Sequence, residues 1–132
     1  TIYMNICFEE KSKIDLKKLE HCCNKAEIIK LINELPDGFD TKIGEGGSRL
    51  SQGQRQRLGL ARALYHTPEV LIMDESTNAL DLKTEEKVLK ILKKLSDSIT
   101  IIIISHSNKP LSYCDRVFEI KNQEIRITEN LK

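Results

Sequence analysis

Two of the most apolar segments in this chain are each followed by residues that can do chemistry. Asp74 and Glu75 come directly after the segment VLIM, and His106 comes two residues after the segment ITIIII. Adjacent side chains that leave a strand point to different sides. One carboxylate could therefore hold Mg²⁺, directly or through water, while the other faces a water molecule as a general base. The alternative is that both acids are solvated in a loop. His106 could reach the same ligand, although a single histidine is more often structural.

A second candidate site lies at residues 49–64, where the sequence reads RLSQGQRQRLGLARAL. Ser51 can cap a helix here, because its side chain can accept from the free N–H groups of the first turn. Apolar residues then recur at spacings of three and four, which predicts a stripe containing Leu58, Ala61 and Leu64. In this interpretation the three arginines of the helix are simply solvated.

The same stretch can also be an anion site. A helix N-terminus presents unpaired N–H groups and partial positive charge to a ligand. Gly53 would let that ligand approach the backbone closely, while Ser51 and Gln54 add side chains that form hydrogen bonds. Taken alone, the stretch is compatible with a cap and with an anion site.

Composition and charge argue against several classes of protein. The 132 residues carry 21 Lys and Arg against 20 Asp and Glu, which gives no electrostatic case for nucleic acid. The apolar runs VLIM and IIII are far shorter than the roughly 20 residues of a membrane-spanning helix, and TIYMNICFEE lacks the basic start of a signal peptide. The four cysteines form no C-x-x-C pair and the three histidines are scattered. We therefore expect reduced thiols in a cytosolic protein, and no metal site built from these residues.

Short helices and loops are expected in the first part of the chain. The pattern predicts a helix at residues 13–23 capped by Ser12, and a second helix at 26–35 that stops before Pro36. At most a brief strand is expected at the N-terminus. A glycine-rich loop, TKIGEGGS, leads into the stretch RLSQGQ.

The later part of the chain changes to strands. VLIM and ITIIII have the form of strands buried on both faces. Residues 83–97 between them predict an amphipathic helix, with Glu86 and Lys90 at the favourable i,i+4 spacing. Strand, helix and strand predict a right-handed parallel crossover, in which ligands bind beyond the carboxyl ends of the strands. Residues 116–120 and 124–128 predict an antiparallel hairpin, so the expected fold class is α/β.

The order of four motifs resembles the nucleotide-binding domain of an ABC transporter. LSQGQ, residues 50–54, resembles the family's signature motif, and VLIMD resembles its Walker B strand. NALD, residues 78–81, resembles the D-loop, and His106 stands in the place of the switch histidine. Four motifs in the family order make the resemblance specific, and it covers essentially the whole chain. TIYMNICF and LPDGFDTKIGEGGSRLSQGQ are similar to exporter segments that follow the Q-loop and run through the X-loop.

The resemblance implies a role for each residue around the nucleotide. Asp74 would hold Mg²⁺ through water, Glu75 would be the catalytic group that polarises the attacking water, and His106 would contact the γ-phosphate. The γ-phosphate of an ATP held by the P-loop of a second nucleotide-binding domain would meet the signature residues Ser51, Gln52, Gly53 and Gln54. The cofactors implied are ATP and Mg²⁺.

The implied fold is a P-loop NTPase-like (ABC ATPase) fragment in two parts. Residues 1–62 would be the helical subdomain with the X-loop and the signature, and residues 63–132 the C-terminal half of a RecA-like parallel-sheet core. Asn78 and Asp81 would lie at the dimer interface. Glu45, in the X-loop, would communicate with the transmembrane domains.

The sequence departs from the family pattern in several places. Gln52 replaces the usual signature glycine, Asn78 replaces the usual D-loop serine, and Ser107 follows the histidine where a basic residue is common. No G-x-x-x-x-G-K-[ST] occurs in the 132 residues, so the phosphate-wrapping loop and its lysine are missing. The adenine-stacking aromatic and the Q-loop glutamine are missing too. We therefore expect the C-terminal part of a domain, with no ATP hydrolysis of its own.

Three classes of function are considered. The resemblance implies an ABC exporter that couples ATP hydrolysis to transport at the cytoplasmic face of a membrane. Its partners would be a second nucleotide-binding domain and transmembrane domains, with no nucleic acid. The alternative is a soluble ABC ATPase of DNA repair, chromosome structure or translation, against which stand TKIGEGG, QRQR and the neutral charge balance. The third class is a non-enzymatic partner module. The sequence predicts no particular transported substrate.

Overall fold

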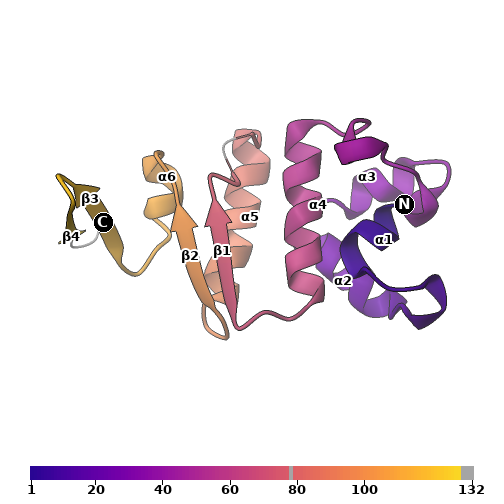
Figure 1. Cartoon of the computed structure of the whole chain (residues 1–132), viewed down its shortest axis with the longest axis horizontal. Helices are drawn as coiled ribbons and strands as arrows, with labels where there is room; N and C mark the ends of the chain where they lie inside the picture. Colours follow the sequence, from indigo (N-terminus) through magenta and orange to yellow (C-terminus); the bar gives the residue numbers. More distant parts are fainter. Residues whose placement is uncertain (78, 129–132) are drawn as a thin grey trace.

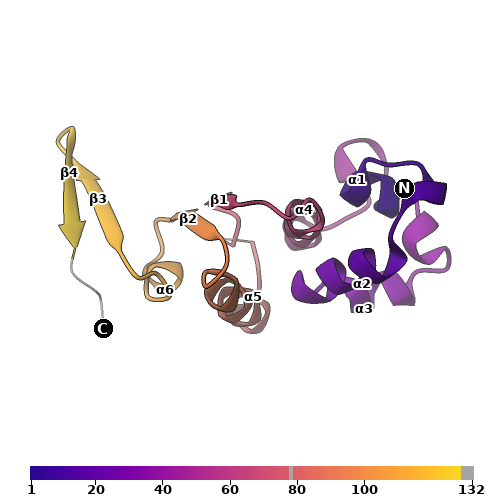
Figure 2. The same ribbon diagram turned by 90° about the horizontal axis from the view of Figure 1, so that it is seen from below.

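The computed structural model of the protein describes residues 1–77 and 79–128. The elements follow one another along an elongated molecule, with a helical cluster at the N-terminal end and a β-hairpin at the C-terminal end (Figure 1). Both views place helix α4 between the β1–β2 pair and the other N-terminal helices (Figures 1 and 2). The molecule therefore divides into a helical region and a sheet region that meet at α4.

The helical region is built from short helices around a continuous apolar core. Its α-helices are α1 (Ile2–Cys7), α2 (Leu16–Lys25), α3 (Ile29–Glu34) and α4 (Gln52–Tyr65), with 3-10 turns η1 (Lys11–Lys13), η2 (Gly38–Asp40) and η3 (Glu45–Gly47). Helix α4 packs against α1 and α2. The stripe predicted on α4 is confirmed, because its apolar side chains are buried in this core: Leu58, Leu60, Ala61 and Leu64.

Two predictions for the first helices are wrong. The N-terminus forms helix α1, where at most a brief strand was expected, because the Thr1 side chain caps it and Ile2 and Ile6 fall on one buried face. Helix α2 is capped by Asp15, whose carboxylate accepts from the Lys18 N–H at 3.0 Å. Ser12 lies inside the preceding turn η1 and cannot occupy the cap position.

The sheet region contains the predicted parallel crossover. Strand β1 (Val70–Asp74) pairs in parallel with β2 (Thr100–Ile104), and α5 (Leu82–Leu95) connects them. The register pairs Ile72 with Ile102 and Asp74 with Ile104, so both strands end at the same edge. The i,i+4 pair on α5 is also confirmed, with Lys90 Nζ 2.6 Å from Glu86 Oε1.

The prediction that both strands are buried on both faces is wrong for this chain. Helix α5 covers one face, where Leu71 and Met73 of β1 are buried in the core that includes the α5 side chains. The side chains at the alternating positions point to the other face, where Ile72 is 62% and Ile102 46% exposed. Alternation along the strand therefore separates a packed face from an apolar face that is open.

The C-terminal part consists of α6 (Asn108–Leu111) and a hairpin of β3 (Val117–Lys121) and β4 (Glu124–Thr128). The predicted antiparallel pairing is confirmed. Asn122 and Gln123 form the turn with φ angles of 52° and 64°, the left-handed conformation that tight hairpin turns require. The apolar side chains of the hairpin are exposed: Phe118, Ile120, Ile125 and Ile127.

Candidate functional site

The carboxylates lie where the first strand ends. Asp74 is the last residue of β1 and pairs with Ile104, the last residue of β2. Glu75 follows with a φ of 46°, and its N–H donates to the Ile104 carbonyl at 3.0 Å. A left-handed conformation is costly for a residue with a long side chain, and such conformations cluster at functional sites. The backbone of Glu75 is thus held by the neighbouring strand while the chain turns away from the sheet.

The two strand ends bring Glu75 and His106 together. His106 Nε2 lies 3.1 Å from Glu75 Oε1, a distance at which the two groups share a hydrogen bond or, with a protonated imidazole, an ion pair. The His106 side chain is 90% exposed and that of Glu75 48% exposed, so both are accessible to a ligand. The β1–β2 register creates this pair, since the residues are far apart in the chain.

Asp74 is an exposed carboxylate at the same edge. Among the described residues, no three His, Cys, Asp or Glu side chains come together in a way that could hold a metal ion. Mg²⁺ is usually bound through one or two carboxylates together with substrate phosphates and water, in place of an all-protein cage. A single accessible carboxylate beside the strand end therefore fits Mg²⁺ that is held mainly by a nucleotide.

The segment after Glu75 leads to Asp81, which caps helix α5. Its carboxylate accepts from the N–H groups of Lys83 at 3.2 Å and Thr84 at 3.1 Å. Hydrogen bonds from Thr84 lower the pKa of Asp81. Asn78 lies outside the described residues. Asp81 therefore caps α5, a structural task that the resemblance to a D-loop does not imply.

The signature stretch forms the start of α4, as predicted. Ser51 Oγ accepts from the Gln54 N–H at 3.2 Å, and Gln54 Oε1 accepts from the Ser51 N–H at 2.8 Å, which together make a capping box. Gln52 is exposed at the first position of the helix. The Ser51 hydroxyl accepts in the cap and still carries its own O–H donor. Capping and anion binding are therefore compatible at this helix start.

A close backbone contact explains why position 53 is a glycine: the residue packs against Ala79 and Leu80 of the same chain. A Cβ atom at Gly53 would lie 2.8 Å from the carbonyl oxygen of Ala79 and 3.5 Å from the Leu80 side chain. Backbone atoms cannot give way at that distance, so any other residue would push the two segments apart. The structure thus places the start of α4 directly beside Ala79 and Leu80, in the segment that resembles a D-loop.

The arginines of α4 are not simply solvated, contrary to the expectation from a capped helix. Arg55 donates to the Leu50 carbonyl, Arg57 to that of Glu27 and Arg62 to that of Asn5, each at 2.6 Å. These carbonyls belong to turns and short helix ends, whose oxygens lack partners within their own element. The arginines therefore tie α4 to the rest of the helical region, and their spacing in the sequence gave no signal of this.

Glu45 begins the turn η3, with an exposed side chain. The glycines around it give the loop its shape, since Gly44, Gly46 and Gly47 have φ angles of 79°, 58° and 73°. The Arg49 N–H closes the loop by donating to the Ile43 carbonyl at 3.0 Å. Among the described residues, no hydrogen bond or ion pair joins Glu45 to Asp74, Glu75 or His106.

A cavity of about 230 Å³ lies between α4 and the β1 side of the sheet region. Its lining is mainly apolar and includes Leu60, Leu71 and Met73. Two lining residues bring a buried oxygen with no hydrogen-bond partner among the described residues, Gln56 Oε1 and Ser76 Oγ. Buried oxygens usually have partners, so this cavity combines apolar surface with unmet polar groups.

Comparison with known proteins decides the family. The profile of the ABC transporter family matches residues 3–78, which is more than half of the chain. This chain belongs to the ABC transporter family. The identification made from the motifs is therefore confirmed. None of the helices in the described residues is long and apolar enough to cross a membrane.

The similar proteins are much longer than this chain. It is 39% identical to the ATP-dependent lipid A-core flippase of Haemophilus influenzae over 132 residues, which are 100% of the chain and 22% of the flippase. It is 44% identical over 100 residues to the heterocyst differentiation ATP-binding protein HepA of Nostoc, covering 76% of the chain and 16% of that protein.

A solved structure supports the same placement. The chain matches a bacterial Atm1-family ABC exporter with ATP bound at a TM-score of 0.90 and 30% identity, covering 99% of the chain and 23% of that exporter chain. The fold is therefore that of part of an ABC exporter. This result confirms the prediction of an α/β fold and the expectation of a fragment.

Proposed function

We propose that this chain is the C-terminal part of the nucleotide-binding domain of an ABC exporter, which hydrolyses ATP to drive transport across a membrane. The observation that carries the proposal is the Glu75–His106 pair, at the carboxyl ends of two parallel strands, where α/β folds bind their ligands. The similarity to a flippase and to an exporter supports transport over a soluble ATPase of DNA repair, chromosome structure or translation.

In this proposal the strand ends divide the chemistry among three residues. Glu75 accepts the proton of the attacking water, and His106 contacts the γ-phosphate and orients that water beside Glu75. Asp74 holds Mg²⁺ through water, and the ion supplies positive charge that stabilises the phosphate oxygens. Catalysis of phosphoryl transfer depends mainly on such positioning and charge stabilisation.

The helix start at the signature completes the site from across a dimer. The Ser51 hydroxyl has an O–H left to donate, and the first turn of α4 presents unpaired N–H groups at Gln52 and Gly53. These groups would bind the γ-phosphate of ATP held by the second nucleotide-binding domain, with Gln54 supporting the cap. Asp81, and Asn78 beyond the described residues, would lie at that dimer interface.

The two-part division also belongs to this proposal. Residues 1–62 form the helical subdomain that faces the transmembrane domains, with Glu45 at the contact, and residues 63–132 belong to the RecA-like core. The open sheet face and the cavity with its unmet oxygens would pack against the part of the core that carries the P-loop. Without that part, the 132 residues would not hydrolyse ATP by themselves. The domain would lie at the cytoplasmic face of the membrane.

The test compares the two carboxylates in the full-length protein. Glu75→Gln keeps the shape of the side chain but removes the proton acceptor. ATP hydrolysis should fall by about 10²–10⁴-fold, the range for loss of a general base, while ATP still binds and the dimer stays closed. Asp74→Asn should instead weaken Mg²⁺-dependent nucleotide binding. Hydrolysis and ATP-dependent dimerisation are measured for each variant, and normal hydrolysis by Glu75→Gln would overturn the assignment.

A further inference from the structure

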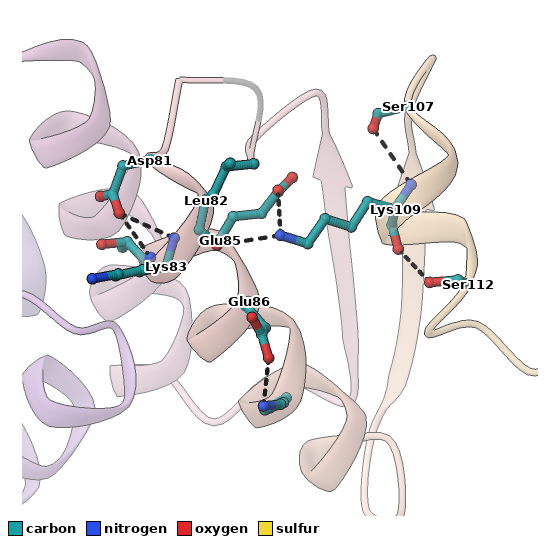
Figure 3. Close-up of polar contacts among 10 residues, drawn as sticks. Asp81, Leu82, Lys83, Glu85, Glu86, Ser107, Lys109 and Ser112 are labelled. Carbon is teal, nitrogen blue, oxygen red and sulfur yellow. Dashed lines mark hydrogen bonds and ion pairs between the residues drawn. The ribbon is translucent and has the colours of Figure 1, made fainter.

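An ion pair joins α5 and α6, the helices that follow the ends of β1 and β2. Lys109 of α6 lies three residues after His106, and Glu85 lies in the first turn of α5, directly after the D-loop segment. Lys109 Nζ is 3.2 Å from Glu85 Oε2 and also donates to the Leu82 carbonyl at 3.2 Å. Figure 3 shows the Lys109 side chain reaching from α6 to the start of α5.

This ion pair is unusually sheltered for this molecule. The Glu85 side chain is 11% exposed and that of Lys109 33% exposed. The Lys90–Glu86 pair on α5 is 62% and 48% exposed and joins residues of a single helix. A sheltered pair is screened less by water and salt, and loss of one partner leaves the other charge buried without compensation.

The turn that carries His106 is held by local hydrogen bonds and by the burial of Pro110. Helix α6 has four residues, of which Pro110 is buried. The turn is held locally, with the Ser107 N–H donating to Ser105 Oγ at 3.0 Å and the Lys109 N–H to Ser107 Oγ at 3.4 Å. His106 itself is 90% exposed, so packing does not hold its side chain. Lys109 connects this turn to a long helix.

We propose that Lys109 is a positioning residue, which holds the His106 turn against the D-loop end of α5 through Glu85. The contacts form a closed circuit: Glu75 leads through the D-loop segment to α5, Glu85 binds Lys109, and α6 leads back to His106, which contacts Glu75. A shift of the D-loop segment on dimerisation is thereby transmitted to His106. This inference rests on the proposed function of Glu75 and His106 in ATP hydrolysis.

The experiment measures kcat and KM for ATP in the full-length protein. Lys109→Met keeps the length of the side chain but removes the charge, so kcat should fall about tenfold, as expected for a coupled contact pair. KM for ATP should stay within about twofold, because the Lys109 side chain contacts Glu85 and Leu82, which are not assigned to nucleotide binding. Lys90→Met is the matched control, since it breaks an ion pair within α5 alone, and it should leave kcat unchanged.

Conservative and reversed variants separate positioning from general stability. Lys109→Arg should retain most of the activity, and Glu85→Lys combined with Lys109→Glu should recover part of the kcat that Lys109→Met loses. Thermal unfolding of each variant shows whether a loss of kcat is only a loss of folded protein. Should Lys109→Met fail to fold, the kcat of the reversed pair is compared with that of the wild type, and a reversed pair that folds but has a kcat more than about tenfold below the wild type overturns the proposal.

The inference and the proposed function fail in different ways. If Lys109→Met has the same kcat as Lys90→Met while Glu75→Gln is inactive, the coupling is wrong and the proposed function stands. If Glu75→Gln hydrolyses ATP normally, the proposed function itself is wrong. A kcat that falls only in proportion to unfolded Lys109→Met protein would make the ion pair purely structural and overturn the positioning role.

Discussion

The helical region and the sheet region bury their apolar residues to very different extents. In the helical region Ile6, Leu19 and Ile32 are 0% exposed, and four helices enclose them. In the sheet region Ile72 is 62% and Ile120 77% exposed. Parallel sheets are normally covered on both faces, so the helical region has a complete core while the sheet region has half of one.

The two regions differ in what they contribute: the helical region contributes a packed core, and the sheet region contributes the polar side chains at the strand ends. The helical region supplies packed surface and arginine contacts that orient α4, and the sheet region supplies the strand ends with Asp74, Glu75 and His106. The second face of the parallel strands is apolar and exposed, and the strand ends carry accessible polar side chains. The signature stretch stands between the two regions, held by its cap on one side and by Ala79 on the other.

The largest effect should come from core substitutions that compare the two regions directly. Ile32→Ala in the helical core should lower the free energy of unfolding by about 2–5 kcal/mol, because it creates a cavity among fully buried side chains. Ile120→Ala in the hairpin should change it by less than about 0.5 kcal/mol, since that side chain is 77% exposed. Urea unfolding followed by circular dichroism measures both. Equal losses would show that the hairpin is as well packed as the helices.

A smaller effect is expected on self-association of the isolated 132-residue chain. The open face of β1 and β2 is apolar, and such faces and their strand edges pair with other chains. Replacing Ile72 and Ile102 by Ser should shift the chain towards monomer, by about tenfold in the dissociation constant. Light scattering over a range of concentrations measures the shift. The same replacement at Ile120 and Ile125 is the control for the hairpin, and an unmodified chain that stays monomeric at high concentration would contradict the prediction.

The smallest effect concerns the pH dependence of stability that arises from the buried cysteine thiols. The pKa values of these thiols report how far water is excluded from each region. Burial raises the pKa of Cys23 to about 12 from an ordinary value of 9.0. The unfolded chain therefore loses this proton first, so the stabilisation is complete below pH 9.0 and is lost as the pH rises towards about 12. At pH 10 the loss should be about 1 kcal/mol.

Matched cysteine variants test this pH dependence. Cys23→Ala should flatten the fall in stability between pH 8 and pH 10, as measured by urea unfolding at each pH. Cys114, which is half-buried near the sheet region, also has a raised pKa because of burial and the nearby Asp115, and Cys114→Ala should flatten the fall less. An identical pH profile for wild type and Cys23→Ala would mean that the helical core admits water.

The features that could be predicted from the sequence alone depend on interactions between residues close together in the chain. The capping box at Ser51 and Gln54 acts over three residues, and the Glu86–Lys90 pair acts over four, so both can be inferred from spacing alone. The parallel crossover and the hairpin follow from apolar patterns and turn residues of the same short range. The motif order was sufficient to indicate the family. The exact helix starts were less predictable, because Ser12 and Asp15 are both able to cap a helix, and in the structure Asp15 caps α2 while Ser12 lies in the turn η1.

Tertiary structure decided the contacts between residues far apart in the chain. The Glu75–His106 distance depends on the register of β1 and β2, and the Lys109–Glu85 pair depends on where α5 lies beside that sheet. The arginine contacts of α4 likewise reach carbonyls that are presented by other elements. Such pairs leave no periodic pattern in the sequence, because their geometry is created only when the elements pack. The sequence alone therefore determined which chemical groups the chain carries, and the packing of α4, α5 and the parallel strands decided which of them meet.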